Sequence, residues 1–191
     1  MGTLRIIAAC LLCATTALPS RAQTANSSAS SEYLIEAGFT YNFAKLMQWP
    51  ATAFAQPDSP IVIGILGTDP FGSTLDSVLA GKKVNARSFV VKHLKWGNDL
   101  KDCNILFVSN SETAHLDEIF RIIKGLPILT IGQMPDFARR GGIINFILED
   151  DKVRFEVNVD AARQADITIS SRLLTLAKIV PQTAADGSKS Q

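Results

Sequence analysis

Two short apolar runs constrain the fold of this chain more than any other feature. Ile61–Leu66 and Ile105–Val108 are continuous runs without a polar residue, most of them aliphatic, a pattern typical of strands that are buried on both faces. Such strands need helices above and below them, which is the arrangement of a parallel sheet in an α/β fold. The sequence therefore predicts a central sheet that is parallel for most of its width.

The remaining pattern alternates between helix and strand until the last third of the chain. Strands at 142–148 and 153–157 flank the acidic turn Glu149–Lys152, which indicates an antiparallel hairpin. We expect an α/β three-layer sandwich with a mostly parallel central sheet and an antiparallel edge hairpin. The other predicted elements are helices at 32–48, around 75–79, at 116–123 and from Ser170 or Ser171 to Pro181, and strands at 87–94 and 127–131.

The first 22 residues have the features of a cleavable signal peptide. Arg5 precedes an apolar run, Ile6–Leu18, and Pro19 and small residues follow it up to Ala22. This run is shorter than the ~20 residues that a bilayer-spanning helix needs. We predict export with cleavage near Ala22, a disordered linker at 23–31, one domain at 32–181 and a disordered tail at 182–191.

Cleavage changes the charge and the cysteine count. It removes two arginines and no acid, so basic residues fall from 19 to 17 against 18 acidic ones, a net charge of −1. This balance argues against binding to nucleic acid and gives no electrostatic reason for binding an anionic membrane, and we expect no membrane insertion of the mature chain. Cys103 is the one cysteine left. It cannot form an internal disulfide, so it is either buried and inert or available to a second chain.

Few residues have the spacing of catalytic or metal-binding groups. His93 and His115 lie on different predicted elements without metal-ligand spacing and are expected to be surface or hydrogen-bonded histidines. The loop Gly64–Gly72 lacks the G-x-G-x-x-G spacing and a following Lys-Ser/Thr, so we interpret it as a strand-to-helix turn. The sequence thus predicts no catalytic residue, no bound metal and no cofactor.

A pair of arginines is a sharper candidate for binding. Arg139 and Arg140 precede the glycine pair Gly141-Gly142, and such a segment can hold a carboxylate or a phosphate. The same residues can instead line a partner surface or form a solvated turn. These three alternatives remain open from the sequence alone.

Several blocks in chain order resemble the YfiR-like family of periplasmic proteins. The resemblance covers nearly the whole predicted domain, roughly Glu32 to Val180, and it is specific to the family. The blocks are Ala37–Lys45 with Trp49-Pro50, Gly64–Gly67, Cys103–Ser109, Arg140–Phe146, Val153–Asn158 and Ser170–Ala177.

This resemblance implies a regulator rather than an enzyme. It implies a periplasmic protein that binds the periplasmic sensing domain of an inner-membrane diguanylate cyclase, holds the cyclase inactive and thereby lowers cyclic di-GMP and biofilm formation. In physical terms, such a regulator binds the inactive state of its receptor more tightly than the active state. The alternative is a ligand-binding or accessory module for another receptor, such as a sensor kinase or an outer-membrane uptake system.

The resemblance also bears on partner contacts. The best-known member uses disulfides, and family members are described as dimers. The resemblance therefore implies a homodimer, and Cys103 is the residue that can link its two chains. An internal disulfide is excluded by the single mature cysteine. Arg139, Arg140 and Arg172 are the predicted contacts to the partner protein, because arginine is enriched in protein interfaces.

Overall fold

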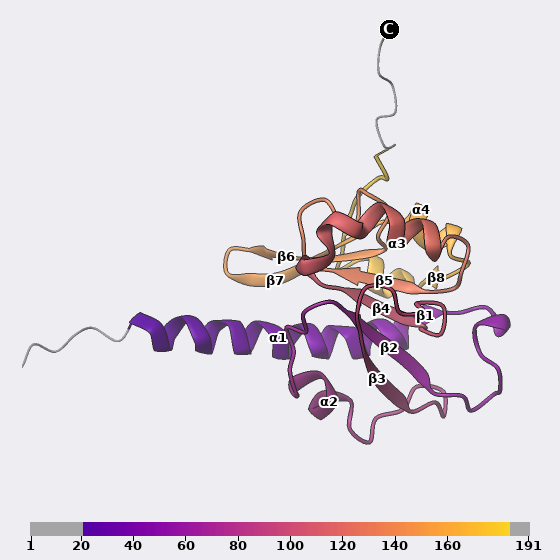
Figure 1. The fold of residues 1–191 in the computed structure, drawn as a ribbon, viewed down its shortest axis with the longest axis horizontal. Helices are drawn as coiled ribbons and strands as arrows, with labels where there is room; N and C mark the ends of the chain where they lie inside the picture. Colours follow the sequence, from indigo (N-terminus) through magenta and orange to yellow (C-terminus); the bar gives the residue numbers. More distant parts are fainter. Residues whose placement is uncertain (1–20, 184–191) are drawn as a thin grey trace, which may run out of the picture.

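A seven-stranded sheet is the centre of the fold (Figure 1). A computed structural model describes the backbone of residues 21–183, with side chains from residue 30 onward. The strand order is β3-β2-β4-β5-β6-β7-β9, and the first five strands are parallel. The strands are β2 (Ile61–Leu66), β3 (Phe89–Leu94), β4 (Ile105–Val108), β5 (Leu129–Gly132), β6 (Ile144–Glu149), β7 (Lys152–Val157) and β9 (Lys178–Ile179).

Helices cover both faces of this sheet, as the buried strand runs predict. Helices α1 (Arg21–Leu46) and α2 (Thr74–Leu79) pack on one face, and α3 (Leu116–Ile122) packs on the other (Figure 1). Alternate residues of β4 separate the two layers, since Phe107 joins the apolar cluster of α1 and Leu106 joins the cluster of α3. The predicted α/β sandwich is confirmed. We refer to these two sides as the α1 face and the α3 face.

Helix α1 differs from the prediction at both ends. It begins at Arg21, so the segment 23–31, predicted to be a disordered linker, is helical. The physical reason is that no proline or glycine interrupts the chain between Arg21 and Ala37. The helix ends at Leu46, before Trp49-Pro50, because β1 (Met47–Gln48) pairs with β8 (Thr168–Ile169). The predicted signal peptide falls on residues 1–20, outside the described residues, and on the first two residues of α1.

An aromatic cluster joins α1 to the hairpin strands. Phe43 is fully buried, with its ring 5.7 Å from that of Phe146 and 5.1 Å from that of Phe155. Phe39 contacts the same two rings at 6.3 and 5.4 Å. Aromatic pairs at these separations add to the free energy gained by burial. This cluster fixes α1 against the sheet.

The hairpin is confirmed, and its turn has the expected chemistry. β6 and β7 are antiparallel, with Glu149 opposite Lys152. The two residues between them, Asp150 and Asp151, have φ angles of 51° and 57°, as a two-residue hairpin turn of type I′ requires. β7 is not the outermost strand, however, because β9 pairs with it in parallel.

The C-terminal part contains more elements than the sequence predicted. The last helix, α5 (Ser171–Leu174), is a single turn that starts at the predicted cap Ser170 and ends well before Pro181. Helix α4 (Val159–Gln164) and β8 were missed. The first residues of the predicted disordered tail are held in place, since the Thr183 amide donates to the Arg139 carbonyl (3.0 Å). Within residues 21–183, no helix combines the length and the apolar character needed to cross a membrane.

Candidate functional site

The order of the strands singles out one edge of the sheet. From β2 the chain passes to β3 on one side, and from β3 it crosses to β4 on the other side of β2. The connections that leave β2 and β4 at their carboxyl ends therefore diverge, and ligands of open α/β sheets bind at such a switch point. We refer to the segments 67–69, 93–96 and 109–115 at this place as the carboxyl edge.

Gly67, the first residue after β2, lets two loops approach closely. Its φ is +90°, which favours glycine. A Cβ atom at this position would lie 2.2 Å from Ser111 Oγ and 2.7 Å from Glu112 Oε1. The loop after β2 and the turn after β4 are therefore in direct contact, and a side chain at residue 67 would separate them.

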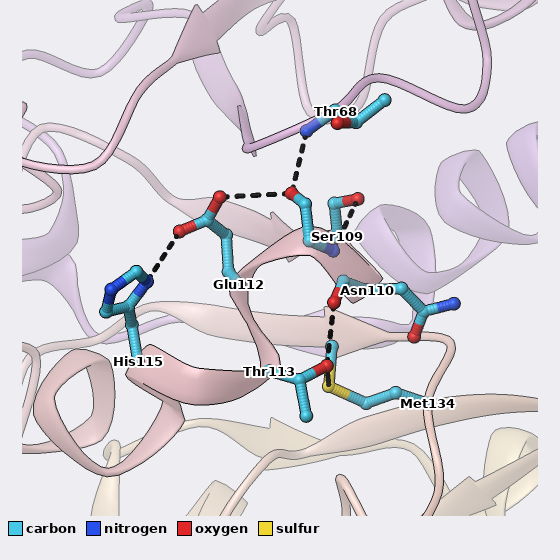
Figure 2. A network of polar contacts seen from close by, with 8 residues as sticks. Thr68, Ser109, Asn110, Glu112, Thr113, His115 and Met134 are labelled. Atoms are coloured by element: carbon cyan, nitrogen blue, oxygen red, sulfur yellow. Dashed lines mark hydrogen bonds and ion pairs between the residues drawn. The ribbon is translucent and has the colours of Figure 1, made fainter.

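A chain of hydrogen bonds ties these two loops together (Figure 2). The Thr68 amide donates to Ser111 Oγ (3.0 Å), and the Ser111 hydroxyl donates to Glu112 Oε1 (3.0 Å). The second oxygen of Glu112 lies 3.1 Å from His115 Nδ1. Glu112 is 7% exposed, and both of its carboxylate oxygens have partners. Glu112 thus occupies the buried part of the switch point, with the exposed Ser111 beside it.

The turn after β4 does not form a capping box. Ser109 and Glu112 have the spacing of a capping box, in which the glutamate would accept from the Ser109 amide. That amide donates instead to the Leu66 carbonyl (3.0 Å), because β4 continues alongside β2. Ser109 Oγ accepts weakly from the Ser111 amide (3.5 Å) at the start of the 3₁₀ turn η2 (Asn110–His115). Glu112 is thereby free to join the network.

Two exposed pairs lie at the rim of the carboxyl edge. The ring of Trp96 stacks on that of His115, with centroids 4.3 Å apart and planes 8° from parallel. His93 Nε2 lies 3.0 Å from Asp69 Oδ2. Trp96 is 37% exposed, so part of its ring is available to a partner.

Both histidines therefore lie at the same edge. Each is partly exposed and paired with a carboxylate, as expected for surface or hydrogen-bonded histidines. Their proximity is not apparent from the sequence, because His93 lies near the end of one strand and His115 follows another. A topological argument was available, since parallel strands end at one edge of a sheet. Among residues 30–183, no group of three or more His, Cys, Asp or Glu side chains is arranged to hold a metal ion.

The structure does not bring the three predicted partner arginines together. Arg140 Nη2 lies 2.9 Å from Asp117 Oδ1 of α3, and Arg139 Nε lies 3.8 Å from Asp136 Oδ1. Arg172 is exposed on α5, whose Leu173 belongs to the cluster of the α1 face. Arg140 thus contacts α3, whereas Arg172 lies on α5, which packs next to α1.

Cys103 lies just before β4 and is 4% exposed. Burial, the largest effect, raises the pKa of its thiol to about 11. Its sulfur lies so close to β2 that a Cβ on Gly64 would be 2.6 Å from it. An intermolecular disulfide stays a prediction, and it would require β2 and β4 to expose this sulfur.

The fold and the site together define a class of protein. The class is a doubly wound α/β domain whose switch point is occupied by its own buried Glu112 and carries an exposed aromatic rim. A comparison with family models identifies the family: the model described as YfiR/HmsC-like matches residues 33–178. The chain belongs to the YfiR/HmsC-like family, which confirms the resemblance found in the sequence. No curated protein matches the chain.

Membership of the YfiR/HmsC-like family indicates a general function. The YfiR-like family comprises periplasmic regulators of diguanylate cyclases rather than enzymes. It also suggests, in general terms, an interaction with a membrane signalling protein. These statements concern the family, and the particular partner and contact surface of this chain are the subject of the proposals below.

Proposed function

We propose that this chain is a periplasmic binding protein that inhibits an inner-membrane diguanylate cyclase by binding its periplasmic sensing domain. Binding lowers cyclic di-GMP and, with it, biofilm formation. Family membership over residues 33–178 carries this proposal. The regulator stabilises the inactive cyclase because it binds that state more tightly than the active state.

The carboxyl edge is the surface that we propose for this contact. Glu112 is buried there, and the hydrogen bonds through Ser111 hold its two loops together, so its exposed part is a fixed surface. Trp96 is held there by its stack on His115. A partly exposed tryptophan on a rigid support is the type of side chain that contributes most to protein interfaces.

The first test is genetic. Deleting the gene in the bacterium that encodes it is expected to raise cellular cyclic di-GMP, measured by mass spectrometry of nucleotide extracts. The wild-type gene should restore the lower level. Unchanged cyclic di-GMP, together with no cyclase co-purifying with the tagged protein, would contradict the proposed function.

The second test concerns the surface. Trp96→Ala is expected to weaken binding to the cyclase's periplasmic domain at least about tenfold, the loss typical of an interface hot spot. Leu176→Ala is the matched control, because Leu176 is 63% exposed and lies outside the carboxyl edge. Arg172→Ala tests the α1 face through one of the three arginines that the sequence predicts as partner contacts. If Arg172→Ala weakens binding to the periplasmic domain and Trp96→Ala does not, the interface lies on the α1 face. That result would overturn the assignment to the carboxyl edge.

The predicted homodimer and the intermolecular role of Cys103 remain proposals alongside this function. Sedimentation of the purified domain with and without reductant tests both. A dimer that persists in reductant and in Cys103→Ser supports non-covalent assembly, which is what the burial of Cys103 favours.

A further inference from the structure

A groove between α3 and α4 is not used by the proposed function. It has a volume of about 490 Å³ and shares no residue with the carboxyl edge. This size lies within the range of small-molecule sites, about 300–1,000 Å³. Its floor is apolar and buried, and it is formed mainly by Ile123, Ile128, Ile143 and Ala161, with Phe120 half-buried beside them.

The groove stays open because small residues line one wall. Gly141 has a φ of +120°, and a Cβ atom there would lie 3.5 Å from the Phe120 ring. Ala161 and Ala165 of the α4 segment present only methyl groups. At one end, Gln164 Nε2 donates to Gln182 Oε1 (3.1 Å) and closes the groove.

The rim carries an excess of positive charge. Arg121, Lys124 and Arg140 line it, against the single carboxylate of Asp117. Arg121 also pairs with Glu118 (3.0 Å), whereas Lys124 has no ion-pair partner within the described part of the chain. An apolar floor below a cationic rim matches a ligand with an apolar body and an anionic head.

The ion pair of Arg140 indicates which type of anion the rim can bind. Its guanidinium already binds a carboxylate, that of Asp117, at 2.9 Å. The side chain of Asp117 is 88% exposed, so little free energy holds this pair together. A carboxylate arriving from solvent can replace Asp117 and bind both arms of the guanidinium fork.

We propose that the α3–α4 groove binds a small amphiphilic carboxylate, with its alkyl body on the apolar floor and its head on Arg140 and Lys124. This assigns a role to the Arg139-Arg140-Gly141-Gly142 segment: Arg140 holds the head group, and Gly141 keeps this wall of the groove free of a side chain. The site is independent of the proposed contact with a cyclase.

The test uses octanoate as the probe, with octylamine and octan-1-ol as partners of equal chain length. Isothermal titration should give a Kd on the order of 0.1–1 mM for octanoate. Binding of octanol should be weaker and that of octylamine weaker still, because the rim is cationic. In a ¹⁵N-edited spectrum, shifts caused by octanoate should be confined to amides of α3, α4 and the other segments that line the groove, residues 123–130, 140–143, 165 and 182. Equal binding of octylamine, no binding of octanoate, or shifts elsewhere would overturn the proposal.

Variants separate the head-group contact from the floor. Arg140→Gln should weaken octanoate binding about tenfold, the usual effect of losing a charge-assisted hydrogen bond. Asp117→Asn, which frees Arg140, should leave binding unchanged or tighten it about threefold. Ala165→Phe should block the groove, and its folding is checked by circular dichroism. If Arg140→Gln and wild type bind octanoate equally well, the assignment of the head-group site is wrong.

Discussion

The two faces of the sheet are held together by different kinds of contact. On the α1 face, packing is aromatic and largely dry, centred on Phe43. On the α3 face, apolar packing is interrupted by buried polar side chains that bind backbone groups. Asn145 Oδ1 accepts from the Met134 amide (3.1 Å), and Thr130 Oγ1 accepts from the Ile143 amide (2.8 Å).

Unpaired polar atoms lie on the opposite face from these polar contacts. Among the described residues, two buried side-chain atoms lack a hydrogen-bond partner, Glu36 Oε2 and Trp49 Nε1. Both belong to α1 or to the segment directly after it. The α1 face therefore gains its stability from buried apolar area and tolerates unpaired polar atoms, whereas the α3 face depends on hydrogen bonds that each fix one loop.

The largest expected effect tests the packing of the α1 face. Phe43→Ala should lower the free energy of unfolding by about 3–5 kcal/mol, because it removes a fully buried ring and leaves a cavity. Phe120→Ala is the matched change on the α3 face, where the ring is half-buried beside an existing groove. Phe120→Ala should lower the free energy of unfolding by about half as much as Phe43→Ala. Urea unfolding followed by circular dichroism measures the stability of both variants. Equal losses of stability would contradict the contrast between the two faces.

A smaller effect tests the polar contacts of the α3 face. Asn145→Ala should cost about 2–3 kcal/mol, because it leaves the buried Met134 amide without an acceptor. It also removes the partner of the Glu156 carboxylate (3.3 Å). The control is Asn110→Ala at an exposed position, which should change stability by less than about 0.5 kcal/mol. If the two variants lower the free energy of unfolding equally, the hydrogen bond from the Met134 amide to Asn145 adds little stability.

Much of the fold was predictable because it depends on local pattern. The strands 61–66 and 105–108 have the predicted bounds, since a continuous apolar run needs no distant partner to be recognised. The hairpin turn was predictable for the same reason. Helix α4 was missed because only six residues form it, and its main sequence signal is the cap Asn158, which accepts from the Ala161 amide.

The carboxyl edge was much less predictable. Its geometry depends on the order of the strands, and that order brings His93 and His115 to one edge from distant parts of the sequence. The role of Gly67 could not be found from the sequence, because the neighbours that require a glycine there are Ser111 and Glu112. Arg140 was identified as an anion-binding candidate, but its ion pair with Asp117 of α3 joins two residues that are distant in the sequence.

The last prediction concerns the buried carboxyl of Glu36, one oxygen of which has no hydrogen-bond partner on the α1 face. Glu36 is 1% exposed, and burial, with a smaller contribution from the nearby Glu32, raises the pKa of its carboxyl to about 8 from an ordinary value of 4.5. Below pH 4.5 the group is protonated in both the folded and the unfolded chain, so the full stability is present. Between pH 4.5 and about 8 only the unfolded chain loses the proton, and stability falls as the pH rises.

Glu36→Gln removes this ionisable group and should flatten that dependence. At pH 8 the variant should be more stable than wild type by about 1–2 kcal/mol, because the gain from removing the ionisation is partly offset by the buried amide of glutamine. At pH 4 the two proteins should differ little. Urea unfolding across this range measures the effect, with Glu118→Gln, whose side chain is 50% exposed, as the control. Parallel stability curves for wild type and Glu36→Gln would mean that Glu36 ionises normally in the folded protein, and that the α1 face holds a partner for its carboxylate.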